Sequence, residues 1–248
     1  MPDHEKLRMG DDDHDTPRAS ASRERAPGPT DVPIWDWPVR FVHWAIVLLL
    51  VVLLATGKAG GDWLVWHMRA GETLLALVLF RVLWGVAGSR HARFASFVRG
   101  PREVVAYARS LLRPSHATFA GHNPLGGWMV VLLLVALLVQ AGLGLFTNDD
   151  IMNEGPLVRH LSKDFSDQLS SLHRRNAWIV VGLASVHIVA VLGYLAAFRD
   201  NLITPMFTGR KRLGAAWQAE RTGATANRRA VALLLACGIA VWLLVRRW

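Results

Sequence analysis

The chain has 248 residues, of which 52% are hydrophobic and 19% are charged, and its mean hydropathy is +0.26. An average soluble domain carries about 25% charged residues, so this composition favours an integral membrane protein over a soluble one. The formal net charge of +9 does not indicate nucleic-acid binding, because no recognition motif for DNA or RNA is present. The basic residues gather in loops beside apolar stretches, which is typical of contact with anionic membrane lipid.

The elements predicted along the chain are mainly membrane helices. Residues 1–33 are expected to form a disordered cytoplasmic tail, because the first 31 residues are polar and lack the apolar core of a signal peptide. Five later stretches approach the roughly 20 apolar residues that cross a bilayer. They cover about 38–57, 66–88, 124–146, 172–198 and 229–248. The sequence therefore predicts an all-α integral membrane protein: a four-helix transmembrane bundle over 34–212, then a linker and a fifth C-terminal transmembrane helix within 213–248.

The loop charges predict how these helices are oriented. Segments 89–122 and 199–229 are rich in arginine and lysine, whereas segment 148–170 has five acidic residues against two basic ones. Because positively charged loops stay on the cytoplasmic side, we expect a multi-pass protein of the bacterial inner membrane with its N-terminus in the cytoplasm. Segment 148–170 then lies outside, where it could hold a short helix on the membrane surface.

Four of the ten histidines lie within the apolar stretches or at their edges. An ionisable group in a bilayer needs a partner. His173 and His187 are fourteen residues apart, about 3.9 helical turns and about 21 Å, so they project from nearly the same face of the fourth helix at two depths. His67 begins the second helix at the outer depth, and His43 lies near the start of the first helix at the inner depth. The spacing predicts two pairs, His67 with His173 and His43 with His187.

Two imidazoles from facing helices can serve as the axial ligands of a haem iron. We therefore expect two haem b groups, bound non-covalently because a CxxCH attachment needs two cysteines and Cys237 is the only one. A metal ion bound directly by each pair is a competing interpretation, but zinc normally takes four ligands and no acidic residue or cysteine stands beside these histidines. Another alternative is a haem-free membrane transporter or anchor that uses its histidines as hydrogen-bonding groups between helices.

Three arginines are candidate partners of the haem propionates. Arg81 lies fourteen residues after His67, which places it near the depth of the inner haem, and a buried arginine needs an anion. Arg40 and Arg174 each lie within three residues of a predicted haem ligand. Anchoring of a helix end at the membrane interface explains these two equally well.

Glycine and one further histidine give weaker signals. Gly71 and Gly182 are expected to allow close approach of a flat ring, whereas Gly142 and Gly144 are interpreted as plain helix packing. His122 precedes the third apolar stretch and is expected to cap that helix, with a place near a quinone site as the alternative.

Several short motifs extend this interpretation. They are Trp35-Asp36-Trp37-Pro38 with Arg40, Phe41, His43 and Trp44; Phe80-Arg81 with Trp84-Gly85; Gly121-His122-Asn123-Pro124; Asp149-Asp150 with Glu154-Gly155-Pro156; and Leu172-His173. Together they resemble the bacterial cytochrome b561 and nickel–iron hydrogenase b-type cytochrome family, over about 34–212. The resemblance implies two b haems ligated by His43, His67, His173 and His187, and electron exchange with quinone. It also implies a redox partner protein such as a hydrogenase, another dehydrogenase or a cytochrome c. A stand-alone quinone oxidoreductase acting on a small oxidant such as superoxide is the alternative.

Overall fold

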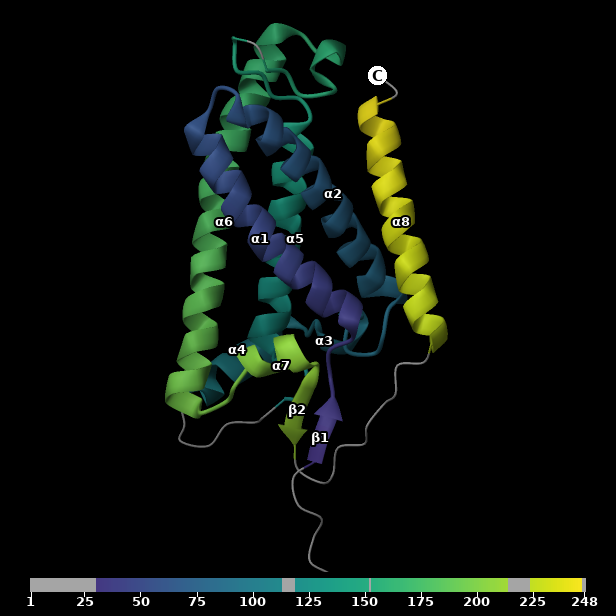
Figure 1. The fold of residues 1–248 in the computed structure, drawn as a ribbon. Helices are drawn as coiled ribbons and strands as arrows, with labels where there is room; N and C mark the ends of the chain where they lie inside the picture. The colour runs from purple at the N-terminus through teal and green to yellow at the C-terminus, as the bar shows by residue number, and fades with distance from the viewer. Residues whose placement is uncertain (1–29, 113–118, 152, 214–223, 247–248) are drawn as a thin grey trace, which may run out of the picture.

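The structure, a computed structural model, describes residues 30–112, 119–151, 153–213 and 224–246. Within these ranges, five helices are long and apolar enough to cross a membrane. They are α1 (Trp37–Ala59), α2 (Trp63–Ala87), α5 (Pro124–Gly144), α6 (Lys163–Phe198) and α8 (Ala224–Arg246). They run in alternating directions, with α6 and α8 on opposite flanks and α1, α2 and α5 between them (Figure 1). The chain is an all-α, multi-pass membrane protein, which confirms the predicted fold class.

Helix α2 forms the centre of the bundle. It packs against α1, α5 and α8, and Leu74, Val78 and Phe80 on it are almost fully buried. By contrast, α6 packs mainly on α5 and makes few close backbone approaches to α1 or α2. The two predicted histidine pairs nevertheless bring side chains of α6 to those of α1 and α2.

A small antiparallel sheet joins the two ends of the four-helix part of the chain. Strand β1 (Thr30–Pro33) pairs with β2 (Arg210–Leu213), with Thr30 opposite Leu213. Gly209 makes the turn into β2 with a φ of 78°, and its carbonyl accepts hydrogen bonds from the backbone of Ile34 and Trp35. We call this end of the bundle the sheet end, and the opposite end, which holds the α1–α2 and α5–α6 connections, the loop end (Figure 1).

The sheet corrects one predicted boundary. Residues 30–33 were expected to end a disordered tail, but they form β1 because Val32 and Ile34 are buried against Leu213 and Ala120. The rest of the predicted tail, 1–29, and most of the predicted linker, 214–223, lie outside the described residues.

Asp36 ties the start of α1 to α2. Its carboxylate accepts a hydrogen bond from the backbone N–H of Val39 at 3.0 Å, which caps the helix, and another from Trp84 Nε1 at 2.9 Å. The side chain is buried, so both bonds are shielded from water. One carboxylate thus fixes both where α1 begins and how it sits on α2.

Replacing Asp36 by alanine is expected to lower the free energy of unfolding by about 2–4 kcal/mol. An N-cap contributes about 1 kcal/mol, and leaving the buried indole N–H of Trp84 without an acceptor costs about 1–3 kcal/mol. The measurement is the midpoint of thermal unfolding in detergent. Asp36→Asn, which keeps an acceptor oxygen, should lose less, and an alanine variant as stable as the parent would contradict this account.

The loop end is held by the first turns of α6, which begin at Lys163 rather than near the predicted residue 172. The extra turns are polar, so the apolar pattern did not extend to them. Ser166 is buried and donates to the carbonyl of Phe146, and Asn148 Nδ2 donates to Ser166 Oγ. The surface helix expected in 148–170 is reduced to a 3-10 turn, η1 (Val158–His160).

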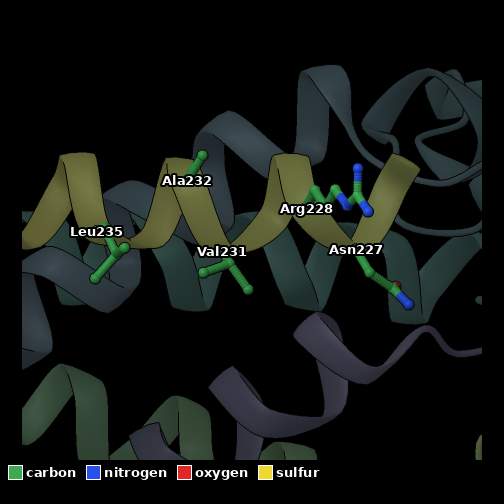
Figure 2. Close-up of a pocket in the computed structure, with 5 residues that line it drawn as sticks. All are labelled: Asn227, Arg228, Val231, Ala232 and Leu235. Atoms are coloured by element: carbon green, nitrogen blue, oxygen red, sulfur yellow. The ribbon is translucent and has the colours of Figure 1, made fainter. Parts of the chain in front are cut away.

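Three short helices and the start of α8 lie towards the sheet end (Figure 1). These are α3 (Phe94–Phe97), α4 (Pro101–Ser110) and α7 (Ile203–Thr208). The fifth long helix, α8, buries Ala230 and Cys237 against α1 and α2, and Trp37 Nε1 donates to Asn227 Oδ1 at 3.0 Å. A shallow hollow on its surface is lined only by α8, with the residues Asn227, Arg228, Val231, Ala232 and Leu235 (Figure 2). None of the histidine-bearing helices α1, α2 and α6 contributes a lining residue to this hollow.

Candidate functional site

The structure brings the four predicted histidines together as the two predicted pairs. At the loop end, the ring centroids of His67 on α2 and His173 on α6 are 6.2 Å apart. At the sheet end, those of His43 on α1 and His187 on α6 are 6.4 Å apart. Both pairs share α6, so one continuous helix sets the depth of both sites.

Hydrogen bonds fix the orientation of the loop-end pair. Nδ1 of His67 lies 3.0 Å from the carbonyl oxygen of Leu53, and Nδ1 of His173 lies 3.0 Å from the carbonyl oxygen of Gln140. A carbonyl oxygen can only accept a hydrogen bond, so each Nδ1 carries the proton and each Nε2 keeps its lone pair. This is the tautomer in which a histidine binds a metal through Nε2, with the second ring nitrogen held by the protein.

The sheet-end pair is surrounded differently. The ring of His43 is edge-on to Trp44, whose indole stacks on Phe207 of α7 with ring centroids 4.4 Å apart. Nδ1 of His43 is buried and has no hydrogen-bond partner among the described residues. His43 is therefore held by its contact with Trp44, which α7 in turn fixes, and one of its ring nitrogens has no partner among the described residues.

The geometry of both pairs fits a haem iron. An imidazole nitrogen binds a metal at roughly 2 Å, and the ring centre lies roughly 1 Å behind that nitrogen, so two axial imidazoles have centroids roughly 6 Å apart. The observed separations of 6.2 and 6.4 Å match this value. Among the described residues, no group of three or more histidine, cysteine or acidic side chains is placed to hold a bare metal ion. Axial ligation of a haem is therefore the chemistry that these pairs suit best.

Helix α5 contributes polar groups that the sequence analysis missed. The Gln140 side-chain nitrogen lies 3.2 Å from Nδ1 and 3.1 Å from Nε2 of His173, and its oxygen accepts a hydrogen bond from Asn176. Because this nitrogen is nearly equidistant from the two ring nitrogens, it lies away from the direction of the Nε2 lone pair. An amide in an otherwise apolar span is a signal that could have identified Gln140, since such a group needs a partner in the membrane.

Two glycines border the loop-end rings. A Cβ atom at Gly57 would lie 3.0 Å from Cε1 of His67, and one at Gly144 would lie 3.1 Å from Cε1 of His173. Gly144 was interpreted as plain helix packing, so the structure corrects that interpretation. Gly71 and Gly182, the glycines expected to face a ring, have little or nothing near the position of a Cβ atom.

The comparison with known proteins agrees with this geometry. The profile of the prokaryotic cytochrome b561 family matches residues 34–209, which include both histidine pairs and most of the chain. The chain belongs to this family. It is therefore a membrane-embedded b-type cytochrome that works in electron transfer.

Several relatives match this cytochrome over most of their own length. A protein of Bradyrhizobium diazoefficiens named as a probable Ni/Fe-hydrogenase B-type cytochrome subunit is 25% identical over 78% of this chain and 91% of its own length. A protein of Cupriavidus necator with the same name is 24% identical over 71% of this chain and 85% of its own length. The probable Ni/Fe-hydrogenase 1 B-type cytochrome subunit of Escherichia coli is 23% identical over 71% and 88%. No solved structure matches the chain.

The arginines of this cytochrome lie in three different settings. Arg81 is buried, donates to the carbonyl of Ala92 at 3.3 Å and has no ion pair among the described residues. Arg40 donates to the carbonyl of Phe207, whereas its buried Nε has no partner among the described residues. Arg174 is exposed at the loop end. Among the described residues, Arg81 therefore has no ion-pair partner and Arg40 has one nitrogen without a partner, whereas Arg174 lies at the surface.

His122 does not cap α5, contrary to expectation. The cap is Asn123, whose side chain accepts a hydrogen bond from the backbone of Gly126. His122 instead lies between Trp35 and Phe97, with ring centroids 4.7 and 4.4 Å away. Burial and the charge of Arg81 lower the pKa of His122 to about 3, so its ring is neutral at physiological pH.

Proposed function

We propose that this cytochrome binds two haem b groups, one between His67 and His173 and one between His43 and His187, and transfers electrons across the membrane between the quinone pool and a redox partner. The observation that carries this proposal is the pair of imidazole separations, 6.2 and 6.4 Å, at two depths of α6. Each haem would supply a one-electron iron centre held by two histidines, which favours electron transfer over oxygen chemistry.

The chain contributes the positions, the tautomers and the surroundings of the ligands. The carbonyls of Leu53 and Gln140 hold two rings with Nε2 directed away from the backbone, and this second hydrogen bond strengthens an imidazole as a ligand. The fourteen-residue spacing on α6 sets the two sites about 21 Å apart along the helix. The two sites therefore lie at opposite depths of one bundle, as transfer across a membrane requires.

The arginines are assigned to the haem carboxylates in this proposal. Arg40 and Arg81 serve the haem at the sheet end, and Arg174 serves the haem at the loop end. Support comes from burial without an ion pair for Arg81 and from the unpartnered Nε of Arg40. A guanidinium group binds a carboxylate with up to two parallel hydrogen bonds.

A hydrogenase is the partner that the relatives favour, since they are named as probable Ni/Fe-hydrogenase B-type cytochrome subunits. The loop charges support a bacterial inner-membrane location with the sheet end in the cytoplasm. Residues 34–212 then form the di-haem part of the chain. Helix α8, which lies beyond the matched segment 34–209 and packs on α2, is an additional span.

The test is an absorption spectrum of the detergent-purified protein before and after dithionite, together with a haem count per chain. We expect a low-spin b-type spectrum, two haems per chain and re-oxidation of both by a quinone analogue. Co-purification with a hydrogenase, compared with isolation as a single chain, tests the partner separately. A colourless protein from haem-replete cells would overturn the proposal.

A further inference from the structure

Three buried side-chain nitrogens have no hydrogen-bond partner among the described residues: Arg40 Nε, His43 Nδ1 and His122 Nδ1. All three belong to the sheet end. At the loop end, by contrast, Nδ1 of His67 and Nδ1 of His173 are both hydrogen-bonded to carbonyls. Buried polar groups in native proteins almost always have partners, so this grouping points to a polar ligand at the sheet end.

One side of His122 leads to Arg40. The His122 ring lies against Trp35, with ring centroids 4.7 Å apart. The carbonyl of Trp35 and Nε of Arg40 both lie close beside Gly209, where a Cβ atom would be 2.8 and 3.2 Å from them. Trp35 therefore lies close to both the imidazole of His122 and the guanidinium group of Arg40.

The other side of His122 leads to Arg81. Phe97 lies 4.4 Å from His122 and 5.8 Å from Phe94 between ring centroids, and Cζ of Arg81 is 5.5 Å from the Phe94 ring. Arg81, His43 and His187 are near enough to His122 to disfavour a positive charge on its ring. Aromatic rings thus connect His122 to both guanidinium groups, and the sheet-end histidine pair is nearby.

The charges of this region call for an anion. Arg40 and Arg81 contribute two positive charges, and Asp36, which acts on Arg81, contributes one negative charge, so one positive charge is left in excess. Asp36 already accepts hydrogen bonds from Val39 and Trp84. A ligand with carboxylate groups would satisfy both guanidinium groups and the unpartnered imidazole together.

We propose that His122 is a binding residue for the porphyrin of the His43–His187 pair, donating its ring N–H to a propionate carboxylate that Arg40 and Arg81 neutralise. The inference rests on the proposed function and adds a residue from outside the two pairs. It gives the short segment before α5 a role in setting the electronic properties of one haem but not of the other.

The experiment compares His122→Phe and His122→Asn with the parent protein, each purified as the full chain and titrated redox-potentiometrically by absorbance. His122→Phe should lower the midpoint potential of one haem only, because a propionate without its donor keeps more negative charge near the iron and favours the ferric state. A tenfold stabilisation of the ferric state corresponds to about 59 mV for a one-electron couple. His122→Asn keeps an N–H donor and should shift less. The haem affected must be the one that His187→Ala removes.

The controls separate this inference from the proposed function. His160→Asn removes an exposed histidine at the loop end and should leave both potentials unchanged. Unchanged potentials in both His122 variants, or equal shifts of both haems, would overturn the inference while leaving the two haems in place. A raised KM for a quinol with both potentials unchanged would also overturn it, by assigning His122 to the quinone headgroup.

If His122→Phe does not accumulate, the one-haem shift is tested with His122→Asn and His122→Gln. A parent protein without haem would instead refute the proposed function itself.

Discussion

Alanine at position 187 is expected to halve the haem content of the purified protein, from two haems per chain to one. His187 is the α6 member of the sheet-end pair, and its ring centroid lies 6.4 Å from that of His43. Without it the iron keeps one protein ligand, which does not retain a low-spin haem through purification. The loop-end pair is about 21 Å away along α6 and should keep its haem. Haem extraction with a chain count, and the low-spin ferric signals in electron paramagnetic resonance, give the readout.

Combined variants make the pairing itself testable. His43→Ala, His187→Ala and their double variant should each retain the same single haem, because either substitution already destroys the sheet-end site. His67→Ala and His173→Ala should retain the other one. The cross-pair double variant His67→Ala with His187→Ala should be colourless. A His43→Ala protein that lost the haem retained by His187→Ala would show that the pairs are assigned wrongly.

Valine at position 144 is expected to weaken or abolish haem binding at the loop end alone. A Cβ atom there would lie 3.1 Å from Cε1 and 3.5 Å from Nδ1 of His173, and the added methyl groups need still more room. The ring cannot yield freely, because Nδ1 is bonded to the carbonyl of Gln140. Overpacking of this kind costs about 1–3 kcal/mol, which corresponds to a roughly 5- to 150-fold loss of haem affinity. Gly57→Val should act in the same way through His67. Haem occupancy after dilution in detergent measures the effect.

Gly142 provides the matched control for this prediction. It lies on the same helix two residues earlier, and nothing stands within 4 Å of a Cβ atom placed there. Gly142→Val should therefore keep both haems. Equal haem loss in the Gly142 and Gly144 variants would mean that valine disturbs α5 as a whole, and the proposed contact with His173 would then be irrelevant.

The helices and histidine pairs could be predicted because both depend on the regular geometry of the α-helix, its rise per residue and its 3.6-residue repeat. Apolar length indicated the five spans, and fourteen residues of helix necessarily bring His173 and His187 to the same face. His43 and His67 start or nearly start their helices, so their depths followed from the direction of each span. No packing detail was needed, and the structure places the four rings in the expected couples.

The surroundings of the rings could not be predicted, because they come from residues without a period of their own. The proton positions at the loop end depend on backbone carbonyls of Leu53 and Gln140, and any residue type carries a carbonyl. The role of Gly144 depends on which face of α5 meets α6. Nearly every residue of α5 is apolar, so its sequence does not distinguish a buried face from a lipid-facing one.

The short sheet was missed for a related reason. Its second strand, Arg210–Leu213, reads RKRL and has the composition of a charged loop. Pairing with Thr30–Pro33 depends instead on the left-handed turn at Gly209 and on the burial of Val32 and Leu213. Both are tertiary effects that act between residues about 180 positions apart.

The antiparallel ladder between β1 and β2 closes the polypeptide into a loop that contains the four histidines of the two pairs. Thr30 faces Leu213, so the chain enters and leaves this loop at neighbouring points on one side of the bundle. Cleavage between Leu213 and α8 would break the covalent link to the last helix without opening the loop that β1 and β2 close. Residues 30–213 therefore form a unit whose two ends are paired with each other. Such a unit is suited to circular permutation, and α8, which lies outside it, is suited to exchange for another membrane helix.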